Sequence, residues 1–297
     1  MKFLMVGASG FIGRHLMAQL ESDGLQAIGT QSESHLSNLI VFNLLEDRIQ
    51  DCVGEKFLQS DHPVVCIIGA GISRIDLCLP DPHTSYLINV DKTIRLIDDL
   101  LGYGVKPVFL SSDGVFDGTL GYYTEKHPCS PLHEYGRQKV QVEEYLQAVA
   151  PDSLILRLGR VVGDDLTESH LFSEWYRLAK EHKQIDCIER HILSPTYVED
   201  VAKGIILACK YGLTGIYHLT NSEFFPRDEL ATQFLQSLGL QAEVVCKPEQ
   251  EFNLLQPRAA KTYFDSSKFV NATGMKFTSM RKVFKLLSQS PELAHQQ

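Results

Sequence analysis

The stretch that decides the fold is Lys2-Phe3-Leu4-Met5-Val6-Gly7-Ala8-Ser9-Gly10-Phe11-Ile12-Gly13. Its apolar start predicts a buried strand, and the residues after the glycines have helical periodicity, with Ile12, Leu16 and Leu20 on one face. The glycines form a GxxGxxG turn, whose backbone can approach a pyrophosphate at the N-terminus of the following helix. The stretch therefore predicts a strand, turn and helix that bind a dinucleotide.

Further apolar runs alternate with helical patterns, and this alternation predicts a parallel sheet covered by helices. The fold class we expect is α/β, a doubly wound parallel sheet of the Rossmann type with a smaller C-terminal substrate-binding portion. Helices are expected at 11–22, 82–103, 132–149 and 226–238. The expected strands are Phe3–Val6, Gln26–Gly29, Leu39–Phe42, Val64–Ile68, Val108–Ser111, Leu154–Leu158 and Gly215–Leu219.

The chain is expected to divide into two portions and a tail. The NAD(P)-binding domain would comprise residues 1–163 plus 194–219, and the substrate-binding portion residues 164–193 plus 220–287. Ser194 as cap and Pro195 at the first position predict the start of a helix. We expect short strands and one helix in residues 240–287, and a frayed tail in the polar residues 288–297.

The composition excludes several classes of function. The 297 residues carry a formal net charge of -9, which repels nucleic acid. No apolar run approaches the roughly 18 residues of a membrane span, so no membrane contact is expected. The 11 histidines show no metal-ligand spacing, which predicts no metal site. The seven cysteines lack a CxxC pair and are typical of reduced core residues in a cytoplasmic protein.

The end of the second predicted strand bears on the choice of cofactor. An acid that grips the ribose of NAD would stand there, but the sequence is Ile28-Gly29-Thr30-Gln31-Ser32. Its polar side chains could instead donate to a 2′-phosphate, with Arg14 or His35 as a local cation. NADP is favoured, and NAD stays open. The residues expected to bind the dinucleotide are Gly7, Ser9, Gly10, Phe11, Ile12, Gly13, Thr30, Asn43, Leu44, Gly69, Ala70, Gly71, Ser111, Tyr135 and Lys139.

Tyr135 and Lys139 form a YxxxK pair, and a helix places residues four apart on one face. The same spacing occurs twice elsewhere in the sequence, so only the surrounding elements show which pair is functional. Tyr135 opens a helix after the strand that ends at Ser111-Ser112, and ligands bind at the carboxyl ends of such strands. An ammonium stabilises a nearby phenolate. We therefore expect Ser112, Tyr135 and Lys139 to be catalytic in a carbonyl reduction, with Tyr135 protonating the oxygen and reduced nicotinamide delivering hydride.

Two longer segments carry a family resemblance. Leu110–Thr119 is LSSDGVFDGT and Pro131–Lys139 is PLHEYGRQK. They resemble the motifs STDYVFDGT and PLNxYGxSK of the dTDP-4-dehydrorhamnose reductase group, within the extended short-chain dehydrogenase/reductases. The resemblance extends over nearly the whole chain, including Ser194–Tyr197 and Arg258–Lys268. It implies NAD(P)H-dependent reduction of a nucleotide-linked 4-keto-6-deoxy sugar by the Ser112, Tyr135 and Lys139 triad, and a homodimer is left open.

Two residues depart from this group. Gly114 stands at its tyrosine and Arg160 at its tryptophan, and both rings would line the sugar pocket. A guanidinium favours a charged or strongly polar substrate group, and the missing tyrosine leaves room for a bulkier one. We expect Asp113, Arg160 and Arg258 to contact the substrate, Arg258 by neutralising a diphosphate.

Two alternatives stay open at this point. Asp113 lies beside the catalytic serine as acids do in the family's dehydratases and epimerases, although those enzymes use a glutamate where Gly114 stands. The altered pocket also allows a non-catalytic NADP-binding subunit, which would resemble the regulatory subunit of methionine adenosyltransferase.

Overall fold

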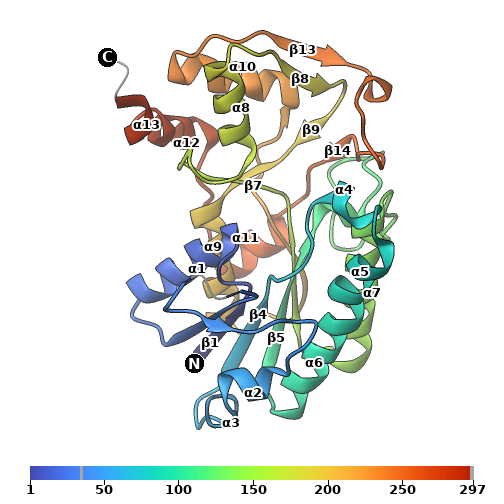
Figure 1. The fold of residues 1–297 in the computed structure, drawn as a ribbon, viewed down its shortest axis with the longest axis vertical. Coiled ribbons are helices and arrows are strands. Elements are labelled where there is room, and N and C mark those ends of the chain that lie inside the picture. Colours follow the sequence, from blue (N-terminus) through green and yellow to red (C-terminus); the bar gives the residue numbers. More distant parts are fainter. Residues whose placement is uncertain (34–35, 295–297) are drawn as a thin grey trace.

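A seven-stranded sheet forms the centre of the molecule (Figure 1). The computed structural model describes residues 1–33 and 36–294. Its sheet strands are β1 (Lys2–Val6), β2 (Ala27–Gln31), β3 (Ile40–Val41), β4 (Val64–Ile68), β5 (Lys106–Ser112), β6 (Leu154–Leu158) and β11 (Gly215–Leu219). All pairings are parallel in the order β11-β6-β5-β4-β1-β2-β3, and each strand overlaps its predicted run. The doubly wound class is confirmed, and its order reverses between β1 and β4, where such sheets bind ligands.

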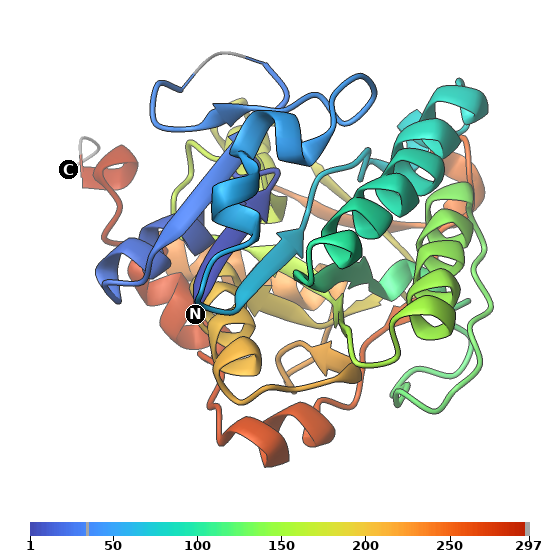
Figure 2. The same cartoon turned by 90° about the horizontal axis from the view of Figure 1, so that it is seen from below.

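Helices cover both faces of this sheet, as Figure 2 shows from below. The longer helices have an apolar stripe, and they pack that stripe on the sheet. Leu20 and Ile205 belong to the apolar cluster on one face, and Ile97 and Leu146 to the cluster on the other. The helices of this layer are α1 (Phe11–Ser22), α2 (Ile49–Val53), α3 (Glu55–Leu58), α4 (Ile75–Cys78), α5 (Pro82–Tyr86), α6 (Thr93–Gly102), α7 (Glu134–Val149), α9 (Val198–Lys210) and α11 (Ser267–Thr273), with a π-helical turn over Leu87–Lys92.

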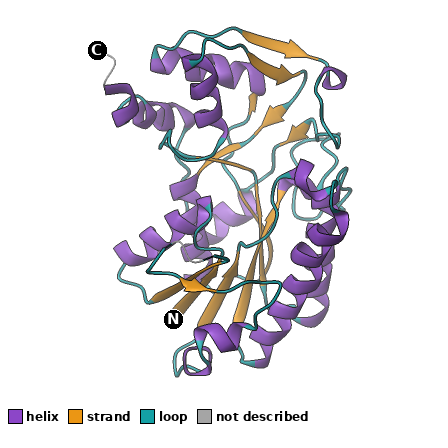
Figure 3. Ribbon diagram, in the orientation of Figure 1, coloured by secondary structure: helices purple, strands orange, loops and turns teal. Residues whose placement is uncertain are grey.

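A smaller layer lies beyond the carboxyl ends of the large sheet (Figure 3). Its core is aromatic: Phe172 stacks on Phe234 with ring centroids 5.4 Å apart, and Trp175 packs beside both. Trp175 is thus a packing residue, as amphipathic periodicity predicts. This layer and its connections contain β7 (Arg160–Val162), β8 (Ile185–Ile188), β9 (Ile192–Leu193), β10 (Pro195–Tyr197), β12 (Phe225–Pro226), β13 (Val244–Lys247), β14 (Lys261–Thr262), α8 (Leu171–Lys180), α10 (Arg227–Leu238), α12 (Met280–Leu287) and α13 (Pro291–Ala294).

The helix expected to start at Ser194 and Pro195 is wrong. Strand β10 occupies Pro195–Tyr197 and pairs in parallel with β7, and α9 begins only at Val198. The Ser194 hydroxyl does not cap a helix, because it donates to the backbone oxygens of Asn221 and Glu223 at 2.5 and 2.9 Å. Tertiary strand pairing therefore outweighs a local capping signal here.

The C-terminal expectations also need correction. Residues 240–287 contain two helices, because α11 packs on the large sheet and α12 on the smaller layer. The tail is not frayed over residues 288–294: α13 forms there, the Tyr176 hydroxyl donates to the Glu292 backbone oxygen at 3.2 Å, and Leu293 packs on the apolar cluster. Residues 295–297 of the predicted tail lie outside the described residues.

Within residues 1–33 and 36–294, no helix is both long and apolar enough to cross a membrane. In the same part of the chain, no group of three or more His, Cys, Asp and Glu side chains is placed to hold a metal ion.

Candidate active site

The glycine-rich turn packs tightly between β1 and α1. Gly7 has a φ of +94°, a conformation that L side chains rarely adopt. A Cβ at Gly13 would lie 2.3 Å from the Gly7 carbonyl oxygen, so only glycine lets α1 start this close to β1. Beneath the turn, buried Thr30 accepts hydrogen bonds from Gly7 N at its Oγ1 (3.4 Å) and from Ala8 N at its carbonyl oxygen (2.8 Å). Thr30 thus holds the turn from below.

A cavity of about 340 Å³, here named the glycine-loop cavity, lies beside this turn. It suits a dinucleotide, because the first turn of α1 holds no acidic residue and the buried Ser111 Oγ has no hydrogen-bond partner among the described residues. On the same lining, Lys139 Nζ donates to the Leu110 carbonyl oxygen at 2.9 Å. Of the residues expected to bind the dinucleotide, those that line the cavity are Gly7, Gly10, Phe11, Ile12, Gly13, Gly69, Ala70, Gly71, Ser111, Tyr135 and Lys139.

The other four residues of that prediction lie outside the lining. Thr30 is beneath the turn, and Leu44 packs in an apolar cluster. Asn43 Oδ1 accepts from Leu45 N at 3.0 Å, and the Ser9 carbonyl oxygen accepts from Arg14. Lining residues that sequence reasoning missed are Met5, Ile72, Ser73, Asn89, Leu110, Leu158 and Ser169.

Asn89 has a clear role in this wall of the cavity. Its Oδ1 accepts from Ile72 N at 2.8 Å and its Nδ2 donates to Gln138 Oε1 at 2.7 Å. The Asn89 amide therefore ties the segment after β4 to α7.

The expected 2′-phosphate contacts are largely occupied by the protein itself. Gln31 is buried, donates to the Leu36 carbonyl oxygen at 2.7 Å and accepts from Leu36 N at 3.1 Å. Arg14 pairs with Glu168 at 2.7 Å. These two side chains would have to exchange contacts within the protein for contacts with a 2′-phosphate, and His35 lies outside the described residues.

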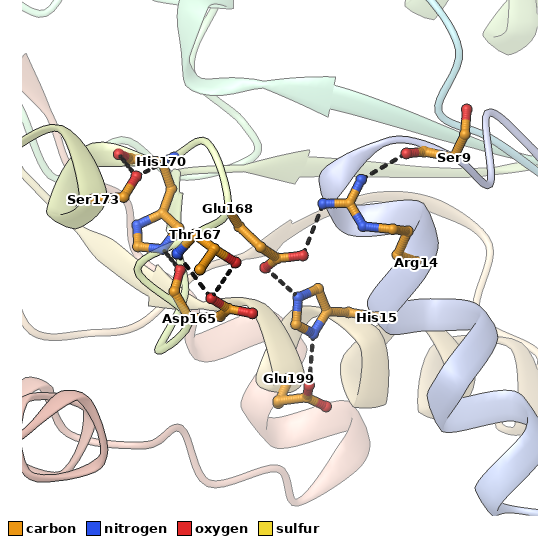
Figure 4. Close-up of polar contacts among 9 residues, drawn as sticks. All are labelled: Ser9, Arg14, His15, Asp165, Thr167, Glu168, His170, Ser173 and Glu199. Carbon is orange, nitrogen blue, oxygen red and sulfur yellow. Dashed lines mark hydrogen bonds and ion pairs between the residues drawn. The ribbon is translucent and has the colours of Figure 1, made fainter. Parts of the chain in front are cut away.

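Residues 163–170, here named the strap, connect β7 to α8 beside the N-terminus of α1 (Figure 4). Glu168 of the strap accepts from Arg14 and also contacts His15 Nε2 at 2.8 Å, while His15 Nδ1 contacts Glu199 of α9 at 2.6 Å. The hydrogen bond with Glu199, helped by Glu168 and opposed by burial, raises the pKa of His15 to about 9. The imidazolium therefore joins three elements at neutral pH.

The strap also touches the glycine-loop cavity. Its Ser169 lines that cavity, and the His170 ring stacks on Phe11, another lining residue, with centroids 5.5 Å apart. These contacts place the strap next to the phosphate-binding turn.

A second cavity of about 260 Å³, here named the arginine cavity, adjoins the first. Ser73 and Tyr135 line both. The sequence-predicted residues that line the arginine cavity, besides Tyr135, are Ser112, Asp113, Arg160 and Arg258. Arg258 pairs with Asp76 at 2.5 Å, so its charge is partly neutralised.

Besides Ser73, sequence reasoning missed three polar residues of the arginine cavity: His133, His191 and Thr262. His133 could have been found from the sequence, because it stands at the cap of the helix, two residues before Tyr135. His191 and Thr262 reach the cavity only through the small sheet of β9 and β14. Burial, and then Arg227 and the other nearby arginines, lowers the pKa of His191 to about 3, so this ring is neutral.

The electrostatics around Tyr135 differ from the expectation. Burial, and then the Asp113 carboxylate, raises the pKa of Tyr135 above its ordinary value. Lys139 Nζ lies 5.6 Å from the Tyr135 ring centroid, and burial lowers the pKa of Lys139 to about 8. The net shift of the Tyr135 pKa is therefore opposite to the expected depression. At neutral pH the phenol holds its proton, which is the form that acts as an acid.

The part of the arginine cavity lined by Ser112, Asp113, Gly114 and Tyr135 is here named the reactive corner. Ser112 Oγ donates to Asp113 Oδ1 at 2.8 Å and accepts from Gly114 N at 3.1 Å. A Cβ at Gly114 would lie 2.8 Å from His133 Cε1. The prediction that Gly114 leaves room for a bulkier substrate group is therefore wrong, because the His133 ring fills that space.

Comparison with known proteins decides the family. The sequence matches the family described as RmlD substrate binding domain over residues 1–290. The chain belongs to this family. The dTDP-4-dehydrorhamnose reductase of Bacillus anthracis, solved in complex with NADP, shares the family fold with a TM-score of 0.83 at 22% identity, over 96% of this chain and 98% of that one. The resemblance inferred from the motifs is confirmed.

Curated relatives in other organisms carry three different names. The spore coat polysaccharide biosynthesis protein SpsK of Bacillus subtilis is 27% identical over 87% of either chain. Methionine adenosyltransferase 2 subunit beta of Xenopus tropicalis is 26% identical over 89% of this chain and 80% of its own. The dTDP-4-dehydrorhamnose reductase of Mycobacterium tuberculosis is 24% identical over 88% of this chain and 83% of its own.

Proposed function

We propose that this protein is an NAD(P)H-dependent ketoreductase that acts on a nucleotide-linked 4-keto-6-deoxy sugar. The observation that carries the proposal is the position of Tyr135, a protonated phenol that lines both the glycine-loop cavity and the arginine cavity. A dinucleotide in the first cavity and a ketone in the second would meet at this side chain. The reductase named among the family relatives supports the substrate class, and the NADP complex supports the cofactor.

The residues divide the reaction between them. Ser112 turns its hydroxyl from Asp113 to the substrate carbonyl and holds it, and Tyr135 gives its proton to the carbonyl oxygen. When bound, the reduced dinucleotide supplies a hydride to the carbonyl carbon. Lys139 lines the cavity expected to hold the nicotinamide ribose and would donate to its hydroxyls. Tyr135 then regains a proton from solvent or through Lys139.

The proposal assigns the remaining residues to the cofactor side or the substrate side of the two cavities. The glycine backbone and Ser111 hold the dinucleotide, and Arg160 and Arg258 face the substrate. Residues 1–163 plus 194–219 bind the cofactor, and residues 164–193 plus 220–287 complete the substrate side. All seven cysteines are free, which supports a cytoplasmic location.

One alternative has an observation of its own. The Xenopus relative is named as a subunit of methionine adenosyltransferase, which favours a non-catalytic NADP-binding subunit. Ser112, Tyr135 and Lys139 at adjoining cavities favour turnover instead, and the experiment below separates the two functions.

The test follows loss of reduced-nicotinamide absorbance with freshly generated dTDP-4-keto-6-deoxyhexose and either NADPH or NADH. We expect turnover by the wild type and a loss of at least about 100-fold in Tyr135→Phe, because general acid catalysis contributes that much. Dinucleotide affinity should stay within about 2-fold in the variant, since the phenol ring remains. Tight NADPH binding without turnover would favour the regulatory subunit, and product formed without net oxidation of NADPH would favour an epimerase or dehydratase.

A further inference from the structure

His133 lies directly before α7 and next to the reactive corner. Its Nδ1 accepts a hydrogen bond from Gly136 N at 3.0 Å, which caps the helix, and its ring stacks on Tyr135 with centroids 6.1 Å apart at 24°. The side chain is buried, with 2% of the residue exposed. This position holds the imidazole rigidly beside the proposed proton donor.

The cap also fixes which ring nitrogen carries the proton. A neutral imidazole has one N–H, and Nδ1 is already an acceptor, so the proton is on Nε2. Burial, and then the guanidinium groups of Arg258 and Arg137, lowers the pKa of His133 to about 4. At physiological pH the ring is therefore an uncharged hydrogen-bond donor through Nε2.

The donor edge of this ring lies at the arginine cavity. A point one Cβ bond above Gly114 is 3.3 Å from His133 Nε2 and 3.5 Å from Ser112 Oγ. Both atoms are therefore close to Gly114 and to each other, and both residues line the arginine cavity together with Tyr135. A helix cap alone does not require this arrangement, because a serine or aspartate caps without reaching into the cavity.

We propose that His133 determines substrate specificity by donating its Nε2–H to a hydroxyl oxygen on the carbon next to the substrate carbonyl. The inference rests on the proposed function, since Ser112 and Tyr135 must hold that carbonyl for the neighbouring carbon to reach His133. A buried donor left without a partner penalises a substrate that lacks the hydroxyl. The site thereby selects α-hydroxy ketones of the sugar class over their deoxy counterparts.

The test compares dTDP-4-keto-6-deoxyglucose with its 3-deoxy counterpart in the wild type, His133→Asn and Gly114→Ala. Asparagine keeps a helix cap but does not reach as far as imidazole. Gly114→Ala keeps His133 as the cap while its Cβ displaces the ring. We expect the wild type to prefer the hydroxylated substrate by at least about 10-fold in kcat/KM, mainly through KM, and both variants to lose that preference. Dinucleotide affinity should be unchanged.

The outcomes separate this inference from the proposed function. Turnover with an unchanged substrate ratio in both variants would overturn it and leave His133 as a cap. If the wild type binds NADPH but reduces neither ketone, the proposed function fails. Calorimetry with dTDP-glucose and dTDP-3-deoxyglucose then tests the inference directly: equal affinities in the wild type contradict it, and a preference lost in His133→Asn supports it.

Discussion

Among single residues, Gly13 packs directly against the carbonyl oxygen of Gly7. A Cβ at position 13 would lie 2.3 Å from that oxygen and 2.7 Å from Ala8 Cα, both backbone atoms. Gly13→Ala must therefore shift the glycine-rich turn, and we expect dinucleotide affinity to fall about 5- to 160-fold, as overpacking of 1–3 kcal/mol implies.

Fluorescence titration with NADPH measures this change. The matched control is Gly102→Ala, because a Cβ at that position meets no atom within 4 Å. Equal affinities for Gly13→Ala and the control would mean that the turn does not hold the phosphates.

A second prediction at this scale concerns a buried ion pair. Arg157 Nη2 lies 2.6 Å from Glu143 Oε2, and both side chains are almost fully buried beneath the site. Glu143→Gln leaves the Arg157 charge buried without a counterion, so the free energy of unfolding should fall by about 3 kcal/mol. Urea denaturation checks this value, with the exposed Glu144→Gln as control. A loss below about 1 kcal/mol would show that the pair is better solvated than its geometry indicates.

At the scale of elements, the strap is a connection whose charges join it to α1 and α9. Its contacts with Arg14 and His15 lie beside the glycine-rich turn, and its Ser169 lines the cofactor cavity. Glu168→Gln removes the carboxylate that contacts both Arg14 and His15, so the strap should separate from α1 more often. We expect the dissociation rate of NADPH to rise about 5-fold, as a loss near 1 kcal/mol implies.

Stopped-flow displacement of NADPH measures that rate. Glu181→Gln is the control, because it breaks a similar carboxylate contact with Lys183 on exposed surface, away from the cavity. A rate that is the same in both variants would mean that the strap does not limit cofactor release.

For the whole molecule, His15 makes stability depend on pH. Its pKa is about 9 in the folded chain and near 6.5 in the unfolded chain, so the folded state binds more protons between these values. The stabilisation is complete below pH 6.5 and is lost as pH rises through 9. Histidines 133, 191 and 218 have lowered pKa values and titrate below this window.

Urea unfolding of the wild type and His15→Gln at pH 6.5, 7.5 and 8 isolates this contribution. Above pH 8 the lowered pKa of Lys139 acts in the opposite direction, since there the unfolded chain binds more protons. The difference between wild type and variant should shrink steadily as pH rises. A difference that is constant over the window would mean that His15 is neutral in the folded protein.

The sequence alone determined the large sheet and the phosphate-binding turn. Each strand overlaps its predicted run, because a buried parallel strand is a short continuous apolar segment that local residues specify. The roles of Gly7 and Gly13 also follow locally, from a turn of seven residues. Ser112 and Tyr135 were predictable because strand ends and the following helix occupy fixed places in a doubly wound sheet.

Only the tertiary structure decided the arginine cavity and the strap. His191 and Thr262 reach the cavity from segments 70 residues apart that meet as β9 and β14, and no local pattern records that pairing. Gly114 alone suggested an empty space, which the ring of His133, 19 positions later, fills. Pro195 signalled a helix, but pairing with β7 made it a strand. The physical reason is common to all three: side-chain neighbours and strand partners distant in the chain are set by the packing of the whole molecule, and that packing outweighs local propensity.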